Sequence, residues 1–120
     1  MFQENPIASP VKVGTYHELA EAIRRGAKEH PRKAVGRYCV YASHEPDAEV
    51  DATCALGAAV IGSGGDVDLL IQRYKPGKYI REVLGLSEYL IDQIISWNDT
   101  DGWSREQIAN ELCIIGGCKH

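Results

Sequence analysis

The side chain with the clearest potential for chemistry is Cys54, which follows Asp51 at the start of an apolar stretch. A thiol in the first turn of a helix has a lowered pKa, because the helix dipole favours the thiolate. His44 is the candidate base, and Asp47 or Asp51 the acid that orients it. One alternative is therefore a cysteine-dependent hydrolase or transferase. Since free cysteines are among the most buried residues, we favour Cys54 as a core residue and a protein that is not an enzyme.

The C-terminal end holds a second group of candidate ligands, Cys113, Cys118 and His120. Thiolate and imidazole groups bind Zn²⁺, and an upstream cysteine or histidine would have to supply the fourth ligand. The spacing Cys-x4-Cys-x-His differs from that of the usual zinc knuckles. A zinc-binding module is a further alternative, while our main expectation is no metal and a short tail over 116–120.

Two further turns each match part of a known ligand-binding loop, one for calcium and one for a dinucleotide. Asp99-x-Asp101-Gly102 is similar to a calcium loop, but that alignment puts Trp97 and Ile108 at ligand positions that require oxygen. The stretch Gly62–Val67 has the first two glycines of a dinucleotide-binding turn and valine in place of the third. We therefore predict no cofactor.

The composition is that of a soluble globular domain, with 44% hydrophobic and 25% charged residues in a chain of 120. The net charge of −4 argues against non-specific nucleic-acid binding, which depends on Lys and Arg neutralising phosphates. Basic residues still form two candidate patches, which we interpret as solvated faces. They are Arg24, Arg25, Lys28, Arg32, Lys33 and Arg37, followed by Arg73, Lys75 and Lys78.

The sequence also predicts where the protein resides. The stretch Met1–Pro10 has neither the basic nor the apolar region of a secretory signal. No run approaches the ~20 apolar residues of a membrane span. Four cysteines in such a chain are more often reduced than bridged. We expect a cytoplasmic protein that does not interact with a membrane.

The element that would position Cys54 is a buried helix over about residues 52–62. All but one of the residues from Ala52 to Ile61 are apolar or glycine, which is typical of a segment buried on every side. Asp51 is the predicted N-cap, and the glycines after Ile61 end the helix. A short strand near 35–41 precedes it, where β-branched and aromatic residues occur without clean alternation.

Capping signals predict the other helices. Thr15 with Glu18 forms a capping box for a helix that Pro31 ends. Ser87 caps a helix through Trp97, and a turn follows over 98–102. The last helix has Ser104 and Gln107 as a capping box, with Trp103 and Ile108 placed for a hydrophobic staple, and ends at Gly116-Gly117.

The order of these motifs resembles small uncharacterised domains of bacteria and their phages. The resemblance lies in Cys54-Ala-Leu-Gly-Ala-Ala59, then Ile95-x-Trp97-Asn98-Asp99, then Ser104-x-x-x-Ile108-Ala109-x-x-Leu112. It implies a small helical intracellular fold and carries over no activity.

We thus predict a mainly α, compact helical domain over 15–115, preceded by an extended arm over 1–14. The expected function is that of an interaction or accessory protein, phage- or mobile-element-encoded, that binds a protein partner or a small ligand. The candidate binding residues lie around the predicted turn and are Trp97, Asn98, Asp99 and Trp103.

Overall fold

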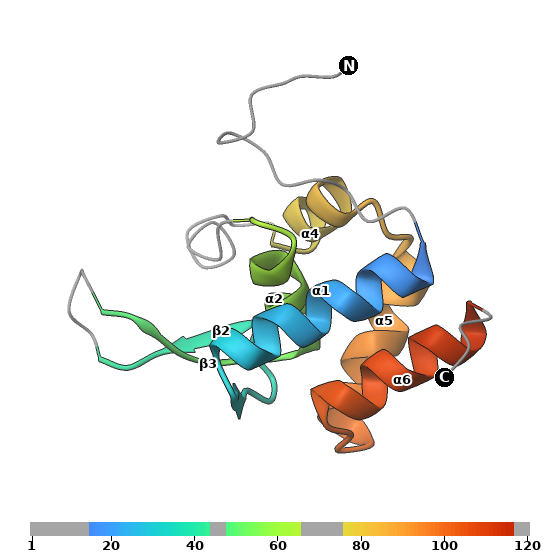
Figure 1. Ribbon diagram of the computed structural model, residues 1–120. Helices are drawn as coiled ribbons and strands as arrows, with labels where there is room; N and C mark the ends of the chain where they lie inside the picture. Colours follow the sequence, from blue (N-terminus) through green and yellow to red (C-terminus); the bar gives the residue numbers. More distant parts are fainter. Residues whose placement is uncertain (1–14, 44–47, 66–75, 117–120) are drawn as a thin grey trace.

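The computed structural model describes residues 15–43, 48–65 and 76–116. It is mainly helical, as predicted, with a small sheet at one end (Figure 1). The elements in chain order are α1 (Tyr16–Glu29), β1 (Arg32–Lys33), β2 (Cys39–Tyr41), β3 (Val50–Thr53), α2 (Ala55–Gly62), α4 (Pro76–Leu84), α5 (Glu88–Ile95), the π-helical turn η1 (Ser96–Thr100) and α6 (Arg105–Ile115). The predicted arm over 1–14, His44, Asp47, Cys118 and His120 lie outside the described residues.

The predicted caps at Thr15, Ser87 and Ser104 are present. The Thr15 hydroxyl accepts from the backbone N–H of Glu18 at 3.0 Å. Ser87 accepts from the N–H of Leu90, and Ser104 forms the full capping box with Gln107. These bonds satisfy N–H groups that the first turn of a helix leaves without a partner.

The segment before α2 differs from the prediction, because the helix expected from residue 52 begins at Ala55 and Cys54, not Asp51, is its N-cap. Residues 50–53 instead form β3, the middle strand of the order β1-β3-β2. β3 pairs parallel with β1 and antiparallel with β2, so its backbone groups are engaged across the sheet. Propensity alone did not reveal this pairing, which depends on strands distant in the sequence.

Helix α1 packs against both α2 and α6 (Figure 1). Its contact with α2 is made through glycines: a Cβ on Gly26 would lie 1.9 Å from the carbonyl oxygen of Ala58, and one on Gly62 would lie 1.8 Å from that of Ala22. The backbones therefore approach more closely than any side chain would permit. α1 and α6 run antiparallel, since Tyr16 lies beside Gly116 while Arg24 reaches Glu106.

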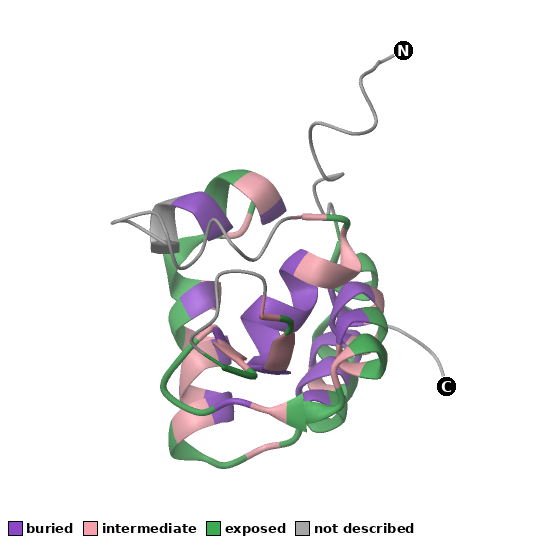
Figure 2. Cartoon of the chain, turned by 90° about the vertical axis from the view of Figure 1, so that its left-hand side faces the viewer, coloured by how far each residue is buried: buried purple, intermediate pink, exposed green. Residues whose placement is uncertain are grey.

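The core gathers on the inner faces of the helices, whose outer faces are exposed (Figure 2). α2 departs from this pattern, because Ala55 to Val60 are all buried. Within the described ranges, no helix is long and apolar enough to cross a membrane.

Candidate functional site

The region predicted as a turn over 98–102 begins as a π-helical turn that continues directly from α5. The N–H of Asp101 donates to the carbonyl of Ser96 at 2.9 Å, the i to i+5 bond of a π-helix. Gly102, with a φ of 71°, then redirects the chain. Single π-turns within helices occur frequently at functional sites, because they widen the helix and reorient side chains.

Asn98, on η1, connects three parts of the molecule. Its side-chain oxygen accepts from the N–H of Ala55 at 3.2 Å, and its amide nitrogen donates to the carbonyl of Ala34 at 2.9 Å. The same nitrogen donates to a carboxylate oxygen of Asp99 at 2.7 Å. Asn98 is only 1% exposed, so these bonds tie the start of α2 and the end of β1 to η1 inside the core.

A pocket of about 180 Å³ lies beside this link. It is lined by residues 36–38 after β1, residues 54–56 at the start of α2, and residues 94–95 and 98–99 of α5 and η1. An apolar cavity of about 150 Å³ binds benzene, so this pocket has room for one side-chain-sized group.

The walls of the pocket combine apolar and polar groups. Leu56, Ile94 and Ile95 are its apolar residues, of which Ile95 is the partly exposed one, and Arg37 and Asp99 bring one charge of each sign. Apolar walls with few polar groups are typical of small-molecule sites.

Tyr38 also lines the pocket, and its hydroxyl is held in the neutral form. Burial raises the pKa of Tyr38, and the nearby groups of Cys54, Asp92 and Asp99 raise it further. At neutral pH this side chain can therefore donate a hydrogen bond to a ligand as well as accept one.

Cys54 lines the pocket as the N-cap of α2. Its sulfur accepts from the N–H of Gly57 at 3.5 Å. Burial raises the pKa of the thiol to about 11, and this effect exceeds that of the N–H groups of Gly57 and Leu56, which lower it. The thiol is thus protonated at neutral pH, and a thiol is a far weaker nucleophile than a thiolate.

Of the other members of the thiol-enzyme alternative, Asp51 is the one that the structure describes, and it does not line the pocket with Cys54. Asp51 pairs with Arg32 at 3.5 Å, on the sheet. His44 and Asp47 are not among the described residues, and the described lining of the pocket contains no histidine.

Trp97 and Trp103 form a separate unit. Their rings stack with centroids 5.1 Å apart and planes at 11°. The N–H of Trp103 donates to the carbonyl of Trp97 at 2.9 Å, which closes the loop between η1 and α6. Neither ring lines the pocket, so of the four predicted binding residues only Asn98 and Asp99 are brought to it.

The predicted zinc ligands can be followed only at Cys113. This thiol is 1% exposed and lies 3.9 Å from a guanidinium nitrogen of Arg24. Among the residues that the structure describes, no three of His, Cys, Asp or Glu are grouped as a metal site would require.

Comparisons with protein-family models, curated proteins and solved structures gave no match to this chain. The site therefore rests on its own geometry. Sequence reasoning missed Arg37, Tyr38 and the isoleucines of α5 as pocket residues. No local signal marks them, because the pocket exists only where three distant segments meet.

Proposed function

We propose that this chain is a binding module that accepts one side-chain-sized group, from a protein partner or a small ligand, in the pocket beside η1. The observation that carries the proposal is the pocket itself, about 180 Å³ in volume, with apolar and charged groups together on its walls. In this proposal α2 is the central element of the fold, and residues 54–56 at its start line the site.

The chemistry of the walls defines the ligand. An apolar body would lie against Ile95, behind which Leu56 and Ile94 are buried. One oxygen of Asp99 accepts from Asn98, which leaves the carboxylate with acceptor capacity for a donor such as an ammonium or amide group. Asn98 itself is fully engaged with the protein, so its role is to position Asp99 and α2.

A binding role fits the site better than the alternative of a cysteine-dependent enzyme. The Cys54 thiol is buried and protonated, and its sulfur is used to cap α2. The resemblance to bacterial and phage domains supports an accessory protein of the cytoplasm.

Benzylamine, which combines an aromatic ring with an ammonium group, is a suitable probe for a titration followed by amide NMR shifts. We expect saturable shifts at Tyr38, Leu56 and Asp99. The Asp99→Ala variant should bind at least about tenfold more weakly, because a hydrogen bond to a charged group contributes about 1.5–3 kcal/mol. Asp101→Ala removes the same charge from an exposed position outside the pocket and is the matched control.

Two results would contradict the proposal. One is the absence of saturable shifts at these pocket residues at millimolar probe. The other is an equal loss of affinity in both variants, which would indicate a general charge effect.

A further inference from the structure

A second pocket, of about 390 Å³, lies between α1, β1 and the start of α6. Its lining includes Arg24 and Lys28 of α1, Lys33 of β1, and Ser104 to Glu106 at the start of α6. It shares no residue with the pocket beside η1, so an inference about it goes beyond the proposed function.

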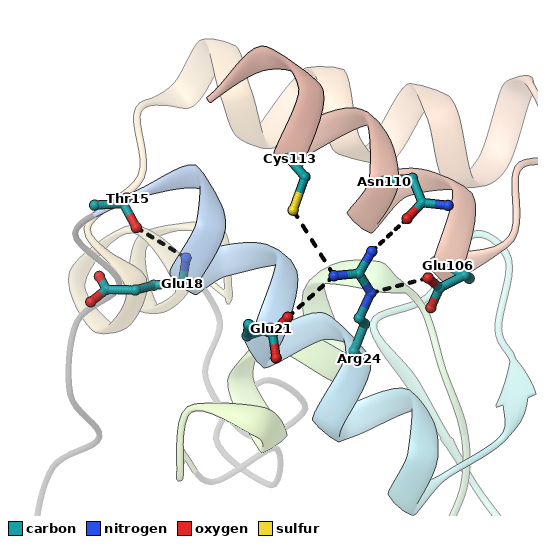
Figure 3. A network of polar contacts seen from close by, with 7 residues as sticks. All are labelled: Thr15, Glu18, Glu21, Arg24, Glu106, Asn110 and Cys113. Atoms are coloured by element: carbon teal, nitrogen blue, oxygen red, sulfur yellow. Dashed lines mark hydrogen bonds and ion pairs between the residues drawn. The ribbon is translucent and has the colours of Figure 1, made fainter. Parts of the chain in front are cut away.

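The lining is strongly basic in a chain whose net charge is −4. Of its charged groups, Arg24 and Glu106 neutralise each other through an ion pair at 3.0 Å, and Arg24 also bonds Glu21 and Asn110 (Figure 3). Lys28, Lys33 and Arg105 remain, and no carboxylate among the described residues pairs with any of the three.

Arg105 makes this imbalance notable, because it is only 6% exposed. Its guanidinium donates to the carbonyls of His30 and Pro31 and, at 2.9 Å, to the hydroxyl of Thr53. These partners are uncharged, and burial lowers the pKa of Arg105. Buried charges in proteins are normally paired with an opposite charge, whereas Arg105 is held by neutral hydrogen-bond acceptors alone among the described residues.

The two lysines lie at the edge of the same pocket. The ammonium of Lys33 donates to the carbonyl of Trp103 at 2.9 Å, which leaves two of its three protons for another acceptor. Lys28 is exposed and has no partner among the described residues. The N-terminus of α6 adds the positive end of its dipole.

We infer that this pocket binds a phosphate group, free or as the monoester of a small molecule. Lys28 and Lys33 contact its oxygens, and Arg105 supplies the buried charge beneath them. Phosphate is favoured over a carboxylate because three separate cations line the pocket and a phosphate offers three or more acceptor oxygens.

The test measures binding of inorganic phosphate and of ribose 5-phosphate by amide NMR at constant ionic strength, with chloride as the reference anion. We expect saturable shifts around Lys28, Lys33 and Arg105. Tighter binding of the ester than of inorganic phosphate would identify a phosphorylated small molecule, and equal binding would identify the free anion.

The variants Lys28→Gln and Lys33→Gln should each weaken phosphate binding by about tenfold, the effect of losing one charged hydrogen bond. Arg81→Gln, which removes an exposed cation from α4, is the matched control and should bind as the native protein does. Lys28→Gln removes no hydrogen bond or ion pair to the described residues, so we expect its fold to be preserved.

The inference is overturned if phosphate produces no saturable shift beyond that of chloride. It is also overturned if Arg81→Gln weakens binding as much as Lys28→Gln, or if only a nucleic acid binds and both small phosphates do not.

Discussion

Removing the side chain of Asn98 should destabilise the protein far more than one polar substitution ordinarily does. In Asn98→Ala, the N–H of Ala55 and the carbonyl of Ala34 lose their bonds to residue 98, and these two residues are 0% and 4% exposed. A buried polar group without a partner costs about 1–3 kcal/mol, so the two together cost about 2–6 kcal/mol. That is a large fraction of the 5–15 kcal/mol that stabilises a typical domain.

A second substitution at the same position separates hydrogen bonding from volume. Asn98→Asp keeps an acceptor for Ala55, but its other oxygen replaces a donor that lies 2.9 Å from the carbonyl of Ala34 and 2.7 Å from the carboxylate of Asp99. This repulsion raises the pKa of the introduced carboxyl above the unfolded value of about 3.9. The variant should therefore be most stable below that pH and lose stability as the pH rises through the folded pKa.

Urea unfolding at pH 4 and pH 7 measures both effects. Asn110→Ala is the control: it removes the same side chain from an exposed position where Arg24 keeps its other partners, and should change stability by less than about 1 kcal/mol. If Asn98→Ala costs no more than this control, the view of Asn98 as a buried link is refuted.

Three further predictions concern other parts of the fold. Gly26→Ala should destabilise by about 3 kcal/mol or more in urea unfolding, because its Cβ would lie 1.9 Å from a carbonyl oxygen; a gain from alanine's helix propensity would contradict this close approach. Between about pH 9 and pH 11, the free energy of unfolding of the native protein should fall, while that of Cys54→Ala should not, because the Cys54 thiol ionises at lower pH in the unfolded chain than in the folded protein. Equal dependence of the two unfolding free energies on pH would exclude a raised pKa of the Cys54 thiol. Arg105→Met should lower the free energy of unfolding by at least about 2 kcal/mol through loss of its bonds to His30 and Thr53, and a melting temperature equal to that of the native protein would show that those bonds contribute little.

The parts of the fold that the sequence predicted well are those with local causes. The caps at Thr15, Ser87 and Ser104 depend on side chains three residues from their partners, and the pattern of each is visible in the chain. Trp103 packs against the core to which Ile108 belongs, and the direct contact of the two side chains in a hydrophobic staple stays a prediction.

The parts that the sequence did not predict depend on residues far apart in the chain. Asn98 is a recognisable candidate, yet its partner Ala34 lies 64 residues away. Arg105 follows a helix cap, a position where a side chain is usually exposed. Here it is buried, and it donates to oxygens of His30, Pro31 and Thr53, which are distant in the sequence. The residues of β3 have the composition of a helix start. They form a strand because β1 and β2 pair with them.

The position of α1 has a consequence for how the chain folds as it is synthesised. α1 ends at Glu29, but α6, which covers one of its sides, begins only at Arg105. At translation rates of roughly 5–20 residues per second, about 4–15 s pass before that helix is made. During this interval α2 is already made and α6 is not, so we expect the glycine contact between α1 and α2 to form first. The partners of Arg24 on this helix, Glu106 and Asn110, are made 82 and 86 residues after Arg24 itself.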